Sequence, residues 1–134
     1  MTTINTRIHY RFERLEHTFC SSPAVQEYRV IYSVVTQYAG QMRVRATLVD
    51  GGLFEIFEHL TKDPDDRILV DKYRYHWQGA AGNLVRRWDT AAHHAHLPHA
   101  PHHVHLPDGH VEGVARPPDL AAVRAQIEAQ LAES

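Results

Sequence analysis

The chain has 134 residues, a length that indicates a single domain with a sizeable buried core. Its hydrophobic content of 43% is ordinary for a globular protein, and a net charge of −2 excludes a strongly basic nucleic-acid coat. No apolar run approaches the roughly 20 residues of a membrane-spanning helix, and Met1 to Asn5 has no signal-peptide character. We therefore expect a cytoplasmic protein that does not bind a membrane.

Both ends of the chain are expected to be helical. In residues 1–22, apolar side chains recur at spacings of four, three and four, which draws one stripe along a helix: Ile8, Phe12, Leu15 and Phe19. In residues 117–133, Pro117-Pro118-Asp119 suits a helix start and precedes a second stripe: Leu120, Val123, Ile127 and Leu131. The second helix is expected to pack on a sheet, with docking of a partner as the alternative. Cys20 cannot form an internal disulfide, and we expect it to be buried.

Residues 26–89 are expected to form an antiparallel sheet. From Met42 to Leu48 apolar and polar residues alternate, with Arg43 and Arg45 on the more open face. Asp50-Gly51-Gly52 is a strong hairpin signal, because glycine allows the positive φ angles of tight turns. The expected strands number about five: Gln26 to Thr36, Met42 to Leu48, Leu53 to Leu60, Ile68 to Gln78 and Leu84 to Asp89. The fold class is therefore α+β, as a meander with a helix at each end.

The segment 90–113 contains one hexapeptide pattern twice, His93–Pro98 and His102–Pro107, joined by His99-Ala100-Pro101. The segment, which includes His110, holds eight of the twelve histidines. Its prolines and glycines and its lack of periodicity predict an extended course over the surface of the sheet, without full pairing. Imidazole titrates near neutral pH and also binds metals, so this segment is the first candidate for a functional site.

Three interpretations of the histidines are open. If the segment is extended, His94 and His96 share one face, as do His103 and His105, and four imidazoles could hold zinc or nickel. Alternatively, His94 and His103 are the acid and base of a phosphodiester cleavage that needs no cofactor, with His105 as a further catalytic residue and His96 in substrate binding. The third interpretation is a polar cover in which each histidine only bonds a nearby carbonyl.

The cleavage interpretation also involves charged residues that precede the histidine segment in the sequence. Arg87 would stabilise the charged transition state, and Asp89 or Glu58 would orient a histidine, although a plain Arg87–Asp89 ion pair is the simpler interpretation. Glu58 lies in an otherwise apolar stretch and must be paired if it is buried, with Arg87 as the expected partner. Arg43, Arg45 and Arg86 would bind the substrate backbone. Arginine suits this role because its guanidinium binds phosphate in a bidentate way. The chain has twelve arginines and only two lysines, although genome base composition also explains that bias.

Several of these motifs together resemble the TumE family of small bacterial toxins. The resemblance runs from about Asp50 to Gly109 and is carried by Tyr73–Gln78, Leu84–Asp89, and the two histidine units with Asp108-Gly109. Asp50-Gly51-Gly52 with Glu58 also fits the family's hairpin followed by a glutamate, with Gly52 in place of a serine. Four positions depart from the family pattern: Thr90 for asparagine, Ala92 and Ala95 for prolines, and Val104 for lysine.

The resemblance implies a growth-inhibiting toxin that a cognate antitoxin neutralises, typically a helix-turn-helix DNA-binding protein from the adjacent gene. It does not imply a mechanism. From the side chains we expect an endoribonuclease without a cofactor, and a homodimer is a further expectation. The alternatives are a metal-binding or partner-binding module, and a toxin that modifies its target, although no phosphate-binding loop of the form G-x-x-x-x-G-K-[ST] is present.

Overall fold

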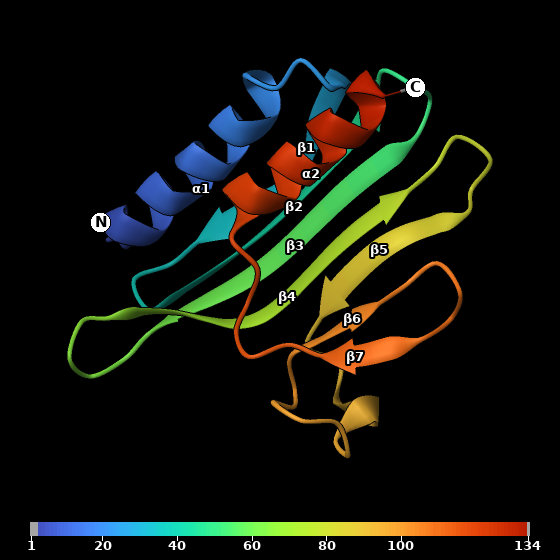
Figure 1. Cartoon of the computed structure of the whole chain (residues 1–134). Helices are drawn as coiled ribbons and strands as arrows, with labels where there is room; N and C mark the ends of the chain where they lie inside the picture. The colour runs from blue at the N-terminus through green and yellow to red at the C-terminus, as the bar shows by residue number, and fades with distance from the viewer. Residues whose placement is uncertain (1–2, 134) are drawn as a thin grey trace.

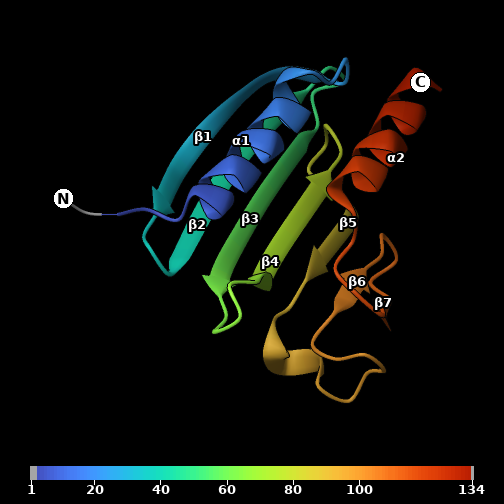
Figure 2. The same ribbon diagram turned by 90° about the vertical axis from the view of Figure 1, so that its left-hand side faces the viewer.

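The computed structural model describes residues 3–133, so residues 1, 2 and 134 of the expected domain lie outside it. A seven-stranded antiparallel sheet carries both long helices, α1 (Thr6–Cys20) and α2 (Leu120–Ala132), on one of its faces (Figures 1 and 2). The strands lie in chain order: β1 (Val25–Val35), β2 (Ala39–Leu48), β3 (Leu53–Lys62), β4 (Ile68–Gln78), β5 (Leu84–Asp89), β6 (His103–His105) and β7 (Val111–Gly113). The α+β meander is confirmed.

The strand count differs from the expected five because the histidine segment pairs with the sheet. His103–His105 continues the sheet beside β5, and Val111–Gly113 closes the far edge after a tight turn at Gly109. The expectation that the segment would not pair fully therefore holds for most of it, but these two stretches add two strands to the sheet. Two short stretches of extended backbone satisfy their hydrogen-bonding groups by joining an open sheet edge.

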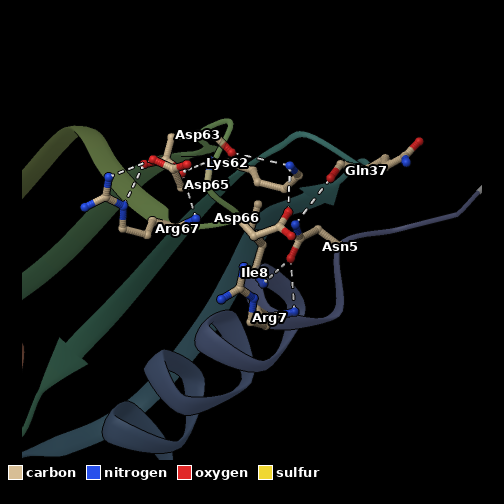
Figure 3. Close-up of polar contacts among 9 residues, drawn as sticks. All are labelled: Asn5, Arg7, Ile8, Gln37, Lys62, Asp63, Asp65, Asp66 and Arg67. Carbon is tan, nitrogen blue, oxygen red and sulfur yellow. Dashed lines mark hydrogen bonds and ion pairs between the residues drawn. The ribbon is translucent and has the colours of Figure 1, made fainter.

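The first helix begins at a polar cap and buries the predicted stripe. The side chain of Asn5 accepts hydrogen bonds from the backbone N–H groups of Arg7 and Ile8, as Figure 3 shows. The close-up also shows the neighbouring β3–β4 turn, where ion pairs such as Lys62–Asp66 form. Ile8 and the other three stripe residues are buried. Cys20, at the end of the helix, is exposed, so the expectation that it is buried was wrong.

The second helix packs on the sheet, as expected. The Asp119 carboxylate caps it by accepting from the backbone N–H of Ala121 at 3.0 Å. Leu120, Val123 and Ile127 are buried in the common core. Among the described residues, no helix is both long and apolar enough to cross a membrane.

The two faces of the sheet differ in composition. We call the side under the helices the helix face and the other side the open face. The helix face holds most of the core, including Tyr73, Tyr75, Trp77 and Trp88. The open face holds two cross-strand rows of mostly polar residues. One runs Arg43, Phe57, Arg74, Asp89, His103, and the other runs Arg45, Glu55, His76, Arg87, His105.

Candidate active site

Two strands place four functional side chains in a square at one end of the open face. Arg87 and Asp89 are two residues apart on β5, and His105 and His103 are their register partners on β6. Residues two apart on a strand project from the same face, and cross-strand partners do so too. Antiparallel pairing therefore assembles these four side chains from two short segments.

The carboxylate of Asp89 is the centre of this square. Its Oδ1 lies 2.6 Å from Nε2 of His103, and its Oδ2 lies 3.5 Å from Nε2 of His105 and 3.3 Å from Nε of Arg87. Oδ1 also accepts from the backbone N–H of Ala91 at 3.0 Å. Asp89 is only 6% exposed, so three cationic or protonatable groups converge on a nearly buried carboxylate. The ion pair between Arg87 and Asp89 exists, but as part of a larger cluster.

A third imidazole, that of His94, lies beside the square and comes from a segment outside the sheet. The chain turns after β5 into a short 3₁₀ helix, Ala92–His94, which brings the ring of His94 to 4.8 Å from that of His103 and 5.4 Å from that of His105. The segment that follows is held against β7. A Cβ on Gly113 would lie 1.9 Å from the carbonyl oxygen of Pro98, so only glycine permits this contact.

The three imidazoles occupy different environments. His103 is 1% exposed, and its Nδ1 lies 2.8 Å from the carbonyl oxygen of Pro101 while Nε2 faces Asp89. Both nitrogens therefore face oxygen atoms of the protein. His105 is less buried. Its burial and the positive charge of Arg87 outweigh the attraction of Asp89 and lower the pKa of His105 below its ordinary value.

The nearest atoms of His94, His103 and His105 that could coordinate an ion all lie within 4.8 Å of one another. This arrangement corrects the expectation of four imidazoles in two pairs. His103 and His105 do share a face, but His96 lies in an exposed turn, with its ring 6.2 Å from that of His94. The turn after the 3₁₀ helix separates His94 from His96, because the backbone there is not extended.

Two predicted site residues lie on the helix face. Arg86 alternates with Arg87 along β5, and its Nη1 donates to Gln126 of α2 at 3.2 Å. Glu58 is fully buried, and its carboxylate accepts two hydrogen bonds of 2.8 Å from the guanidinium of Arg11 and one from the hydroxyl of Tyr75. The expected partner Arg87 was therefore wrong, and Glu58 cannot orient a histidine of the square.

The other predicted arginines lie on the open face but are partly neutralised. Arg43 and Arg45 each contact Glu55 of β3 at 2.6 Å. They belong to the same two rows as the square, three strands from β5, which is roughly 14 Å at the usual strand spacing. Their position fits contact with an extended ligand and excludes direct contact with a group bound at Asp89.

The residues between these arginines and the square were not predicted from the sequence as part of the site. Phe57 on β3, and Lys72, Arg74 and His76 on β4, project from the open face. The signal was present in the period-two pattern of Lys72, Arg74 and His76. Their importance depends on strand order, because β4 lies between the arginines of β2 and the carboxylate of β5.

The fold and this cluster define a small antiparallel-sheet protein with an Asp–Arg–His site at one end of its open face. The model of the TumE family, described as Toxin TumE, matches residues 11–134. The chain therefore belongs to the TumE family of toxins, and membership implies an antitoxin partner. No curated protein and no solved structure matches this chain.

Proposed function

We propose that this toxin acts by cleaving RNA, through acid–base chemistry of the histidines around Asp89. The observation that carries the proposal is the convergence of Arg87, His103 and His105 on one nearly buried carboxylate, with the ring of His94 packed against both of these imidazoles. Phosphodiester cleavage by a ribose 2′-hydroxyl needs a base, an acid and a cation, and this cluster contains all three. RNA as the target would place the action of the toxin in the cytoplasm.

The environments suggest a role for each residue. His105, whose lowered pKa keeps it neutral at neutral pH, accepts the proton of the 2′-hydroxyl as that oxygen attacks phosphorus. His94 donates a proton to the departing 5′-oxygen as the P–O5′ bond breaks, which leaves a 2′,3′-cyclic phosphate and a 5′-hydroxyl. Arg87 stabilises the charge on the phosphoryl oxygens. His103 is too buried to touch RNA, so it holds Asp89, which in turn orients His105.

Purified protein should cleave total cellular RNA in the presence of excess EDTA. His105→Ala should abolish the cleavage, whereas His110→Ala should retain it, because His110 is exposed and outside the cluster. A wild-type protein that never cleaves RNA, with or without added divalent metal, would contradict the proposal.

A metal site is the second candidate, favoured by the mutual approach of the ligand atoms of His94, His103 and His105 within 4.8 Å. Three histidines are a common ligand set for zinc, and a carboxylate behind them would orient the rings. Metal analysis of untagged protein separates the candidates. Stoichiometric zinc or nickel that is lost in His94→Ala would support the metal site, and none would support metal-free catalysis.

The antitoxin is expected to be a helix-turn-helix DNA-binding protein encoded by the adjacent gene. Co-expression of that gene should restore growth and yield a complex with the toxin. The expected homodimer is tested by measuring the mass of the purified toxin in solution.

A further inference from the structure

The open face carries a hollow beside the square that the roles above do not use. It has a volume of about 690 Å³ and is bordered by Phe57, Lys72, Arg74 and the two β5 residues Arg87 and Asp89. It forms where β5 ends at Asp89 while β4 continues, and Ala91 and Ala92, which follow β5, line its other side. The hollow thus opens directly onto the proposed catalytic cluster.

The charges around the hollow are unbalanced. Asp89 is engaged with the square, and Asp71, also at the rim, lies 2.7 Å from Nδ1 of His59. Lys72 and Arg74 are exposed, and neither has an ion-pair partner within residues 3–133. Two unneutralised cations beside Arg87 make this part of the open face attractive to anions.

An aromatic ring lies next to these cations. Phe57 is the register partner of Arg74, and Arg43 lies over its ring at 5.0 Å. A half-buried phenylalanine among arginines, on the polar side of a sheet, is not needed for the core. Aromatic rings interleaved with cations are the features with which proteins bind single-stranded nucleic acids, by stacking bases and holding phosphates.

We propose that this hollow binds the single-stranded RNA that flanks the cleaved linkage, with Phe57 stacking a base and Lys72 and Arg74 contacting phosphates. This inference rests on the proposed function. Phe57 and Asp89 share one cross-strand row, two strands apart, or roughly 10 Å. A base at Phe57 therefore belongs to a nucleotide close to the one at the square, and the unpaired strand is what the site selects.

Binding can be measured apart from cleavage. The probe is a fluorescein-labelled, fully 2′-O-methylated 12-nucleotide single strand of mixed sequence, which has no free 2′-hydroxyl to attack and so stays intact. Fluorescence anisotropy with wild-type protein should show that this strand binds more tightly than a duplex of the same length. Phe57→Leu, which keeps apolar bulk but removes the ring, should weaken binding on the order of tenfold.

The cations give a second readout. Lys72→Ala with Arg74→Ala should lower the slope of log affinity against log salt by roughly 1.4, because each lost phosphate contact on a single strand contributes roughly 0.7. Matched controls are Arg14→Ala for charge and Tyr10→Ala for an exposed ring, both on α1 on the other side of the sheet. Both should bind the probe like wild type, and thermal melts check that every variant folds.

The outcomes separate the two proposals. Equal binding by wild type, Phe57→Leu and the double variant would overturn the hollow as an RNA site, even if the His105-dependent cleavage occurs. Absence of single-strand binding by wild type, or tighter binding of the duplex, would overturn it as well. Loss of binding in the hollow variants of a protein that does not cleave RNA would support the hollow and contradict the catalytic proposal.

Discussion

Each face of the sheet contains a carboxylate that is almost removed from water, and the two have different partners. Glu58 on the helix face is bound by Arg11 and Tyr75, and burial raises the pKa of Tyr75 well above its usual value. These partners keep their protons throughout the neutral range. Asp89 on the open face is surrounded by Arg87 and by imidazoles, the side-chain type whose ordinary pKa lies closest to neutral pH.

Burial of a charged group therefore does not by itself mark a reactive site. The Glu58 network connects α1 to the middle of the sheet through Arg11 and Tyr75, whose raised pKa values keep them protonated at neutral pH. The Asp89 cluster lies on β5 and β6, next to a hollow that opens to solvent. We propose that the first carboxylate stabilises the fold and that the second takes part in the chemistry, and substitutions can test both roles.

The largest effect is expected from His105→Ala. Loss of a general base should lower the rate of RNA cleavage by about 10²–10⁴-fold, with thermal stability close to that of wild type. Initial rates on a labelled RNA measure the change. His110→Ala serves as the control, and an unchanged rate in His105→Ala would remove this residue from the mechanism.

Arg87→Ala should lower the turnover rate by about 10²–10³-fold, because the charge of the transition state loses its stabilising cation. The neighbouring Arg86→Ala is a matched control, since Arg86 projects from the helix face toward Gln126. Steady-state kinetics should show a fall in kcat that exceeds the change in KM. Equal losses in both variants would point to a structural effect on β5.

Arg11→Met should act on stability and leave the chemistry intact. Breaking a fully buried ion pair costs about 3–5 kcal/mol, and a lower value of roughly 2–3 kcal/mol is expected because the Arg11 side chain is 38% exposed. Urea denaturation measures the free energy of unfolding. A variant that folds as well as wild type but no longer cleaves RNA would show that the helix face takes part in catalysis.

The smallest effect concerns the titration of His105. Its pKa should lie below the ordinary histidine value of about 6.5, because burial and Arg87 disfavour the charged ring. Asp89→Asn removes the charge that favours protonation and should lower this pKa further. NMR titration of the imidazole nitrogens measures both values, and a rise in Asp89→Asn would contradict the electrostatic account.

Local patterns were sufficient to predict most of the fold. The apolar stripes predicted both helices, and the alternation of residues with the Asp50-Gly51-Gly52 turn predicted five strands, because these signals depend on near neighbours. The pairing of His103–His105 with β5 could not be read in this way. Three residues carry no usable periodicity, and their conformation depends on the free edge that β5 offers.

The site, too, could be predicted only in part, because some of its contacts depend on residues far apart in the sequence. Arg87, Asp89, His103 and His105 could be proposed from their chemistry, and pairing of β5 with β6 brings them together. Glu58 was assigned wrongly to this group because its partner, Arg11, lies 47 residues earlier in the chain. Phe57 and Arg74 were missed since their role depends on the order of strands across the open face.

The most direct test uses two RNA oligonucleotides of the same sequence in excess EDTA, one unmodified and one with 2′-O-methyl groups throughout. The account predicts that wild-type protein cleaves only the unmodified strand, leaves a 2′,3′-cyclic phosphate, and loses this activity in His105→Ala. Cleavage of both strands, or cleavage only after a divalent metal is added, would contradict metal-free acid–base catalysis by the histidines around Asp89.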